Sequence, residues 1–566
     1  MNHETPRPVS PGVPPPSGSL VAGPAVAPPA PPPRGRDRRR GWLLTVLAAT
    51  LVLFALLLPN RPDRIAPADF LRVPVEALAG AALLVALPRR PGRAVATVLG
   101  ITLALLTVLR LLDLGFYTVL GRPFDPVLDW SYLGNATDYL RTSNGPAAAV
   151  AAAALTALLA VGLLVLIPLA ILRLGRVARQ WRTRTSQALV VLTAGWLAGA
   201  LLGSPVADRD TARLAYGHAL QVGASLHDQT AYRQELAKDA FRDVPGSRLL
   251  TALHGKDVIL TFVESYGRSA LADPGVAAAL DGGTRRLAAA GYSARSGFLT
   301  SSTFGGSSWL GHASLLSGTW VDNQRRHDAL MGSSRLTLTR AFRTAGWRTV
   351  AVLPGTTQPW PEGSFFGYDR IYTGSDLGYR GPKFGWATIP DQFTLAAFHQ
   401  RELAAPHRPL MAEVVLVSSH GPWAPIPRML DWSALGDGSV YDTMPAQGVQ
   451  AGDIWPDQGR VRAAYARSIE YSMDSLLSYL TRYGTKDTVL ILLGDHQPAT
   501  IISGKVPSRD VPVTVVAHDP AVLQRIASWD WTAGLRPEPT APVWRMDAFR
   551  DRFLSAFSPA ARAGTP

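Results

Sequence analysis

The chain has 566 residues, of which 47% are hydrophobic and 17% charged, a balance that favours a protein partly embedded in a membrane. It contains no cysteine, which excludes disulfides, thiolate metal sites and a catalytic cysteine. The formal net charge is +14, but we expect no nucleic-acid partner, because much of this charge lies beside apolar segments, where membrane topology accounts for it.

The first 40 residues are rich in proline and end in a cluster of arginines. Sequence of this kind forms disordered or polyproline segments rather than packed domains. It is too long and too proline-rich for the charged part of a signal peptide. We therefore expect residues 1–40 to be a disordered cytoplasmic arm.

Five apolar segments follow, each close to the ~20 residues that cross a bilayer. Arginines concentrate before the first segment, between the second and third, and between the fourth and fifth. Because arginine-rich loops stay in the cytoplasm, the N-terminus is predicted inside and everything after the fifth segment outside. The predicted transmembrane domain covers residues 41–206, with spans at 42–59, 70–88, 94–115, 147–172 and 187–205.

Two charged residues, Arg110 and Asp113, lie near the outer end of the third predicted span. Their spacing lets them pair on one helix face, and such a pair inside a membrane can mark a functional site. We favour the simpler interpretation that both side chains extend to the interface, because both are near the helix end.

Residues 207–249 are expected to form a helical connector. From residue 250 strands alternate with helices, which predicts a domain over 250–525 with a doubly wound, mostly parallel sheet. A tail at 526–566 with one short helix near 546–557 would end the chain. The expected strands are 257–263, 348–353, 412–418, 488–493 and 511–517, and the expected helices include 336–345, 394–403 and 461–482.

Two of these strands end in residue types that bind metals. Glu264 follows the strand at 257–263, and Asp495 and His496 follow the strand at 488–493. Ligands of open α/β sheets bind at the carboxyl ends of the strands, so we expect these side chains to meet. Taken alone, each has an ordinary alternative as a surface or helix-capping residue.

A serine-rich turn lies between these strands in the sequence, Phe-Gly-Gly-Ser-Ser-Trp-Leu-Gly-His at 304–312. A hydroxyl on this turn could join the same ion. Ser308 is the candidate, with Ser307 and Thr303 as close rivals. The alternative is a polar turn in which serine caps the following helix.

Three motifs in this order resemble the alkaline phosphatase/sulfatase superfamily: Phe-Val-Glu-Ser at 262–265, the turn ending in Ala-Ser-Leu-Leu-Ser-Gly at 313–318, and Gly-Asp-His at 494–496. With five spans before the domain, the chain is similar to the membrane-anchored branch that contains lipoteichoic acid synthases and phosphoglycerol and phosphoethanolamine transferases. The resemblance covers about residues 40–525. It implies an extracytoplasmic, sulfatase-like catalytic domain held at the cell membrane.

The resemblance also implies roles for individual residues. Ser308 would be the nucleophile, and one divalent metal ion, Mn or Zn, would be held by Glu264, Ser308, Asp495 and His496. The substrate-binding candidates are His420, for which an ordinary loop role is the alternative, together with His312 and Trp386.

The turn departs from the sulfatase pattern at two positions. Leu310 and His312 stand where sulfatases carry proline and arginine, and no cysteine is present for conversion to formylglycine. This favours an unmodified hydroxyl that attacks phosphorus over hydrolysis of sulfate esters. The transferase branch more often carries threonine at the nucleophile, so Ser308 leaves the subfamily open.

The expected activity is that of a membrane-anchored, metal-dependent phosphotransferase or phosphodiesterase. It would move a phospholipid-derived head group, of phosphoglycerol or phosphoethanolamine type, through a covalent serine intermediate to a polymer, glycan or lipid of the cell envelope, or to water. A lipid donor suits a domain outside the membrane, where no ATP pool exists. The alternatives are a sulfatase or phosphatase, and a non-catalytic membrane protein that binds lipid or polymer; the presence of all four ligand types disfavours the last.

Overall fold

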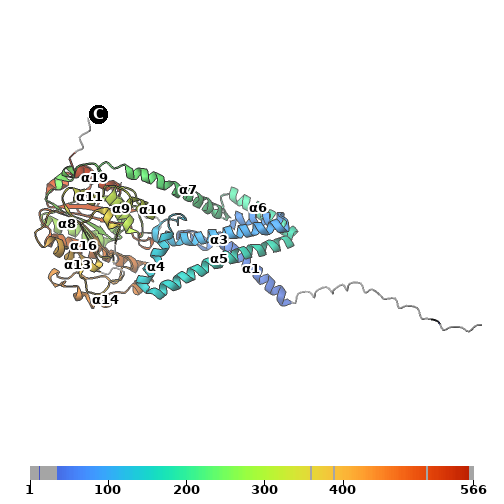
Figure 1. Ribbon diagram of the computed structural model, residues 1–566. Coiled ribbons are helices and arrows are strands. Elements are labelled where there is room, and N and C mark those ends of the chain that lie inside the picture. The colour runs from blue at the N-terminus through green and yellow to red at the C-terminus, as the bar shows by residue number, and fades with distance from the viewer. Residues whose placement is uncertain are drawn as a thin grey trace, which may run out of the picture.

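The computed structural model describes residues 12, 35–204, 206–356, 360–385, 389–504 and 508–559. Figure 1 shows long helices at one end of the molecule and an α/β domain at the other, with helix α7 (Asp210–Ala237) running between them. Most of the predicted N-terminal arm lies outside the described residues, which include only Gly12 and residues 35–40 of it.

Three helices of the described chain are long and apolar enough to cross a membrane: α1 from Arg39 to Leu57, α3 and α5. The other two predicted spans correspond to α2, with 12 residues, and α6, with 20, and neither combines that length with that apolarity. The helices at this end are α1 (Gly35–Leu57), α2 (Val75–Ala86), α3 (Arg89–Leu120), α4 (Trp130–Asn144), α5 (Pro146–Gln180) and α6 (Arg182–Leu201).

The side chains of Arg110 and Asp113 on α3 are buried, which corrects the prediction that they extend to the interface. Arg110 donates to two carbonyls in the last turn of α1, at 2.8 and 2.6 Å, where a positive charge also offsets the helix dipole. Asp113 accepts a hydrogen bond from Asn60 at 2.9 Å and lies 3.2 Å from Nε2 of His218 on α7. The two residues therefore hold α1, α3 and α7 together.

The α/β domain contains one mixed sheet. Over the described residues its strand order is β10–β4–β9–β8–β3–β7–β5–β6, and β11 pairs with β4. The five strands from β8 to β6 are parallel, whereas β9 is antiparallel to β8 and to β4. The strands are β3 (Asp257–Val263), β4 (Ser293–Thr300), β5 (Arg348–Leu353), β6 (Arg370–Thr373), β7 (Leu410–Leu416), β8 (Thr488–Gly494), β9 (Asp510–Ala517), β10 (Thr532–Ala533) and β11 (Val543–Arg545). A separate short pair joins β1 (Val73–Pro74) to β2 (Ala207–Asp208).

The predicted strands correspond to β3, β5, β7, β8 and β9, so the parallel centre of the sheet was expected. The strands β4, β6, β10 and β11 were not. The first half of β4 reads Ser-Ala-Arg-Ser and carries little of the apolar pattern of a buried strand. β10 and β11 lie in the region expected to be a tail, and they extend the sheet edge instead. The short helix expected near 546–557 corresponds to α19 (Ala548–Phe557).

Helices cover both faces of the sheet, because successive side chains of a strand point to opposite sides. Leu260 and Phe262 of β3 pack into a core shared with α9, α11 and α19. Ile259 and Val263 pack into a second core shared with α8, α13 and α16. The helices of the domain are α8 (Pro274–Ala289), α9 (Ser308–Ser317), α10 (Gln324–Met331), α11 (Leu338–Thr344), α12 (Gly363–Phe366), α13 (Asp391–Phe398), α14 (Met444–Gln447), α15 (Ala451–Ile454), α16 (Gln458–Tyr483), α17 (Thr500–Ser503) and α18 (Pro520–Gln524).

Candidate metal centre and nucleophile

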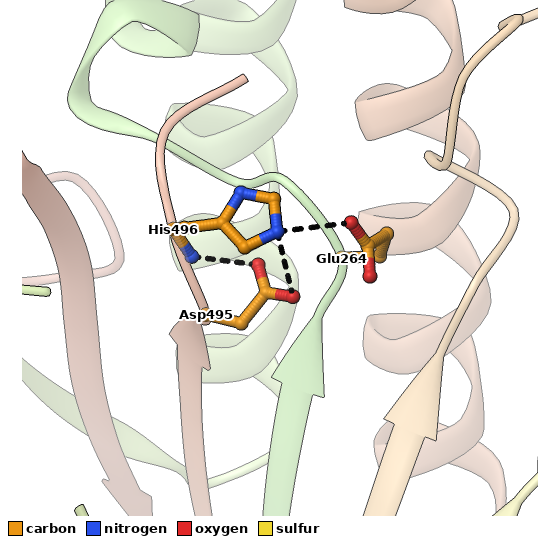
Figure 2. Close-up of side chains that lie close together, drawn as sticks. All are labelled: Glu264, Asp495 and His496. Carbon is orange, nitrogen blue, oxygen red and sulfur yellow. Dashed lines mark hydrogen bonds and ion pairs between the residues drawn. The ribbon is translucent and has the colours of Figure 1, made fainter. Parts of the chain in front are cut away.

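A cluster of three potential metal ligands lies at the carboxyl ends of β3 and β8. These strands are parallel neighbours with Val263 opposite Gly494, so Glu264 and Asp495 leave the sheet side by side. His496 follows directly. One ligand atom from each of Glu264, Asp495 and His496 lies within 4.8 Å of the other two, and all three residues are buried. Figure 2 shows the three side chains directed toward a common point.

A sharp turn after β3 orients the two carboxylates. Ser265 has a left-handed backbone with φ of 56°. Its backbone N–H donates to Asp495 Oδ1 at 2.7 Å, and its hydroxyl donates to Glu264 Oε1 at 2.8 Å. The backbone N–H of His496 donates to the same Asp495 oxygen at 2.7 Å. These contacts hold the carboxylates in place without using Asp495 Oδ2.

The ring of His496 is oriented by its own loop. Nδ1 lies 2.8 Å from the carbonyl oxygen of Gln497, so the tautomer that donates from Nδ1 leaves a lone pair on Nε2. Nε2 lies 3.4 Å from Glu264 Oε1 and 3.6 Å from Asp495 Oδ2. This is the arrangement in which an imidazole can coordinate an ion shared with both carboxylates.

The pKa shifts in the cluster indicate that its two buried carboxylates are stabilised by a nearby positive charge. Burial and the neighbouring Glu264 carboxylate raise the pKa of Asp495 to about 6. Burial lowers the pKa of His496, but the two carboxylates outweigh it and raise this pKa to about 9. Burial raises the pKa of Glu264, but the hydrogen bond and charge of His496 outweigh it and hold the carboxyl well below its usual range. Without an ion, the raised pKa of His496 favours the protonated imidazole, and a bound divalent cation would replace this positive charge and leave the Nε2 lone pair free to coordinate it.

A second observation shows that Glu264, Asp495 and His496 are suited to hold a metal ion. Asp495 Oδ2 is buried and has no hydrogen-bond partner among the described residues. A buried carboxylate oxygen without a partner is costly, so its retention points to a ligand. Two carboxylates and one imidazole form a donor set that suits zinc or manganese.

The serine-rich turn brings Ser308 to this cluster. Gly305 and Ser307 have left-handed φ values of 70° and 63°, and helix α9 begins immediately afterwards at Ser308. The Ser308 hydroxyl donates to Glu264 Oε2 at 3.0 Å and lies 3.2 Å from His496 Nε2. The tight turn thus places the hydroxyl at the start of a helix and beside the candidate ligands.

The two rival hydroxyls point elsewhere. Ser307 donates to the hydroxyl of Tyr132, at the start of α4, at 3.1 Å. The hydroxyl of Thr303 is buried and has no partner among the described residues. Both residues line a cavity of about 290 Å³ between α4, α7 and the turn, which also contains Arg122 and Arg509. Neither hydroxyl has a recorded contact with the three-ligand cluster.

The substrate-binding candidates are in different environments. His312 stacks on Phe262, with ring centroids 3.7 Å apart, and its Nδ1 lies 2.9 Å from Glu413 Oε1. His420 lies in the loop after β7, the strand that pairs with β3. Its Nδ1 lies 2.6 Å from the carbonyl oxygen of Gly421. Trp386 lies outside the described residues.

A buried carboxylate supports the loop that carries His420. Asp391 Oδ1 accepts the backbone N–H groups of Val417 at 2.8 Å and Ser418 at 3.0 Å, and Oδ2 accepts the hydroxyl of Ser472 at 2.6 Å. Burial raises the pKa of Asp391 to about 6. It therefore holds the end of β7 against α16, which is a structural role.

The C-terminal end of α3 packs directly against the serine turn. A Cβ at Gly305 would come within 1.7 Å of the carbonyl oxygen of Val119, and a Cβ at Gly121 within 2.8 Å of the Phe304 ring. Thr500, in the loop after His496, donates to the Thr118 carbonyl at 2.9 Å. Only glycine permits this close approach between a long apolar helix and the turn that carries Ser308.

Several positioning residues escaped the sequence analysis. Ser265 stands next to Glu264 in the quoted motif and Gln497 next to His496, so adjacency was the available signal. Tyr132 had none, because its contact with Ser307 joins residues 175 positions apart. Long-range contacts of this kind leave no local pattern in a single sequence.

Residues 256–512 match the model of the Sulfatase family. No curated protein matches the chain. Similar solved structures include the lipoteichoic acid synthase LtaP from Listeria monocytogenes, with 14% identity over 56% of this chain and 74% of that one and a TM-score of 0.36. They also include the lipooligosaccharide phosphoethanolamine transferase EptA from Neisseria meningitidis, with 11% identity, 90% and 95% coverage and a TM-score of 0.44.

A third such structure is the phosphoglycerol transferase GacH from Streptococcus pyogenes in complex with sn-glycerol-1-phosphate. It is 11% identical over 60% of this chain and 88% of that one, with a TM-score of 0.36. The matched residues include Glu264 after β3, Ser308 at the start of α9, and Asp495 and His496 after β8. Residues 256–512, just under half of the chain, are therefore similar to the Sulfatase family.

Proposed function

We propose that this protein is a membrane-anchored phosphotransferase or phosphodiesterase in which Ser308 is the nucleophile. The observation that carries the proposal is the position of the Ser308 hydroxyl, 3.0 Å from Glu264 Oε2 and 3.2 Å from His496 Nε2. A hydroxyl beside a buried group of metal-ligand residues is the arrangement that activates a serine for attack on phosphorus.

One divalent ion, zinc or manganese, would be held by Glu264, Asp495, His496 and the Ser308 oxygen. When bound, it lowers the pKa of the serine hydroxyl and offsets charge on the phosphoryl oxygens. Glu264 Oε2 is placed to accept the proton of the Ser308 hydroxyl as the oxygen attacks. The ester bond between phosphorus and the lipid alcohol breaks, and this alcohol leaves with the proton that came from Ser308. An acceptor hydroxyl or water then attacks the phosphorus, the bond between Ser308 Oγ and phosphorus breaks, and Oγ takes up the proton of the attacking hydroxyl.

Phosphate rather than sulfate is the proposed centre of attack. Leu310 and His312 replace the proline and arginine of the sulfatase motif, and no cysteine is available for conversion to formylglycine. His312 is also held between Phe262 and Glu413, so it does not extend toward solvent like a free side chain. An unmodified serine suits transfer of a phosphoryl group through an ester intermediate.

The proposed topology has five crossings, with the N-terminus in the cytoplasm and the catalytic domain outside. Contacts at two levels support it. At one level Arg173 of α5 donates to Thr45 of α1 at 3.2 Å, and Arg179 of α5 donates to the Leu84 carbonyl of α2 at 3.3 Å. At the other level Arg110 of α3 binds the end of α1, and Trp196 of α6 donates to the Val73 carbonyl at 3.1 Å. These contacts support a bundle in which helices begin and end at two levels.

The donor would be a membrane phospholipid with a phosphoglycerol or phosphoethanolamine head group, and the acceptor a polymer, glycan or lipid of the cell envelope. The contact between α3 and the serine turn supports a lipid donor, because this turn packs against the C-terminal end of a helix that is apolar enough to span a membrane. Charge near the membrane is accounted for by topology and requires no nucleic acid.

The test uses the purified full-length protein with phospholipids whose head groups carry an isotope label. Mass spectrometry should find a labelled phosphoryl adduct on the peptide that contains Ser308, and released diacylglycerol in metal-loaded samples only. A parallel assay with an aryl sulfate separates the sulfatase alternative. Turnover of the sulfate ester without any labelled adduct or diacylglycerol would reject the proposal.

Topology is tested separately with reporter fusions after residues 90, 180 and 250. The expected positions are inside, inside and outside, because the arginine-rich loops remain in the cytoplasm. An inside position at 250 would overturn the extracytoplasmic placement of the catalytic domain.

A further inference from the structure

A separate cavity of about 430 Å³ lies between the end of α1, the outer half of α3 and the first turns of α7. Large apolar side chains are exposed on α1 from Trp42 to Phe54 and on α3 from Val98 to Leu105. The cavity lining begins just beyond these bands, at Leu56 on α1 and Arg110 on α3. If α1 and α3 cross the membrane, the cavity therefore lies at the level of the lipid head groups.

The lining of this cavity carries an excess of positive charge. Asp69, Asp113 and Asp210 contribute three negative charges. Five arginines line the same cavity, which leaves an excess of two positive charges: Arg61, Arg64, Arg72, Arg110 and Arg213.

Two of these arginines are available to an additional anion. Arg64 is exposed, and its side chain makes no hydrogen bond or ion pair with the described residues. Arg213 has an ion pair with Asp210 at 3.5 Å, and its side chain is 67% exposed. Arg110, in contrast, is already bound to the carbonyls of α1. Guanidinium groups bind phosphate through paired, charge-assisted hydrogen bonds.

The walls of the cavity combine this charge with apolar and unpartnered polar groups. Leu56, Leu57 and Leu214 contribute apolar surface. The side chain of His218 is only 8% exposed, and its Nδ1 has no hydrogen-bond partner within the part of the chain that the structure describes. A lipid head group that joins a phosphate to an apolar tail matches such a surface better than water alone.

We propose that this cavity binds the phosphate-bearing head group of an anionic membrane lipid, whose acyl chains lie along the exposed apolar surface of α1 and α3. The inference rests on the proposed membrane insertion and not on the chemistry at Ser308. Gln221 separates the two regions. It lines both this cavity and the one beside Ser307, and its side chain donates to Asp125 Oδ2 at 3.2 Å.

The test measures binding of short-chain phosphatidylglycerol to the full-length protein in neutral detergent by isothermal titration calorimetry. Short-chain phosphatidylcholine and inorganic phosphate are the comparison ligands. Wild-type protein should bind phosphatidylglycerol at a saturable site distinct from the donor site at Ser308, and this site should bind both comparison ligands at least about tenfold more weakly. The double variant Arg64→Gln/Arg213→Gln should weaken phosphatidylglycerol binding by about tenfold or more, because two charge-assisted contacts are removed.

The matched control removes two exposed charges that do not line the cavity, Arg209→Gln/Arg233→Gln, and should leave the affinity unchanged. Asp495→Asn should also leave it unchanged, which separates this site from the metal-type cluster. An equal loss of affinity in the control, or equal binding of phosphatidylcholine, would refute the proposal. Equal binding of inorganic phosphate would refute a lipid site, and loss of binding in Asp495→Asn would place the lipid at the catalytic cluster.

Discussion

Two clusters of buried charge in the same domain differ in how completely their charges are paired. In the first, Asp239 and Arg550 have fully shielded side chains joined at 3.0 Å. Asp239 also accepts the backbone N–H groups of Phe241 at 3.1 Å and Leu336 at 2.9 Å. Both of its oxygens therefore have partners, and the cluster fastens α19 to the end of the connector.

In the second cluster, Glu264, Asp495 and His496 bring two carboxylates to one imidazole. Asp495 Oδ2 lies 3.6 Å from this imidazole but has no hydrogen-bond partner among the described residues. Fully paired buried charge contributes to structure, whereas incompletely paired buried charge indicates a site that binds something. The completeness of charge pairing therefore distinguishes a structural cluster from a functional one. Residue type does not, because both clusters contain carboxylates and a basic side chain.

The largest expected effect is on catalysis. Ser308→Ala should reduce turnover of a phospholipid donor by roughly 10³-fold or more, since the attacking oxygen is lost. Ser307→Ala removes a hydroxyl of the same turn that contacts Tyr132 instead, and should be much milder. Steady-state rates of the two variants, with thermal melting to confirm folding, make the comparison. Equal losses would show that the turn, rather than one hydroxyl, is what matters.

The next effect concerns metal binding. Loss of a residue that only supports a metal ligand weakens metal binding by roughly 10- to 100-fold. Asp495→Asn alters a ligand itself, so it should weaken zinc or manganese binding by more than this. The metal-free variant should melt at the same temperature as the metal-free wild type or above it, because a buried carboxylate beside Glu264 has been neutralised. Metal content tests the predicted loss of binding, and thermal melting tests the predicted stability. A variant that retains full metal content would show that the ligands are misassigned.

A change in the Asp239–Arg550 cluster should have the opposite effect, with a loss of stability and no loss of metal. Arg550→Met removes one member of a buried ion pair and should cost about 3–5 kcal/mol of stability. Metal content should stay unchanged in protein that remains folded, because Arg550 has no contact with the ligand cluster. Arg552→Met, two residues further along the same helix and packed on Trp544, serves as the control and should cost much less. Loss of metal with unchanged stability in Arg550→Met would contradict the comparison.

A smaller effect, which depends on pH, is expected at Asp391. Burial raises its pKa to about 6 in the folded protein, above the ordinary value of 3.8. The stabilising contribution of the protonated carboxyl is therefore fully present below about pH 4 and is lost as the pH rises through about 6, a change of up to roughly 3 kcal/mol.

The variant Asp391→Asn lacks this titration. Its melting temperature relative to wild type should therefore rise as the pH increases from 4 to 7. The exposed control Asp442→Asn should show no such trend. A difference between Asp391→Asn and wild type that stays constant over this range would show that Asp391 does not titrate there.

The centre of the sheet and the ligand cluster could be predicted because their signals are local. β3 and β8 are continuous apolar runs, and their ligands follow directly in the sequence. The edge strands β10 and β11 have two and three residues, too few to form a pattern. The burial of Arg110 could not be predicted, because its partners lie 54 and 55 residues away, on a helix whose position the sequence does not reveal. Which side chains touch across the chain remained the main unknown.

The packing of Gly305 against Val119 has a consequence for how the protein is studied. A fragment that begins after α7 would keep the whole sheet and the three candidate ligands but would lose Val119, Gly121 and Tyr132. The loop that carries Ser308 would then be missing one wall, with the Phe304 ring newly exposed to water on that side. Rates measured on such a fragment would describe a looser catalyst than the intact chain, and substrate preferences read from it would omit whatever the helical end contributes.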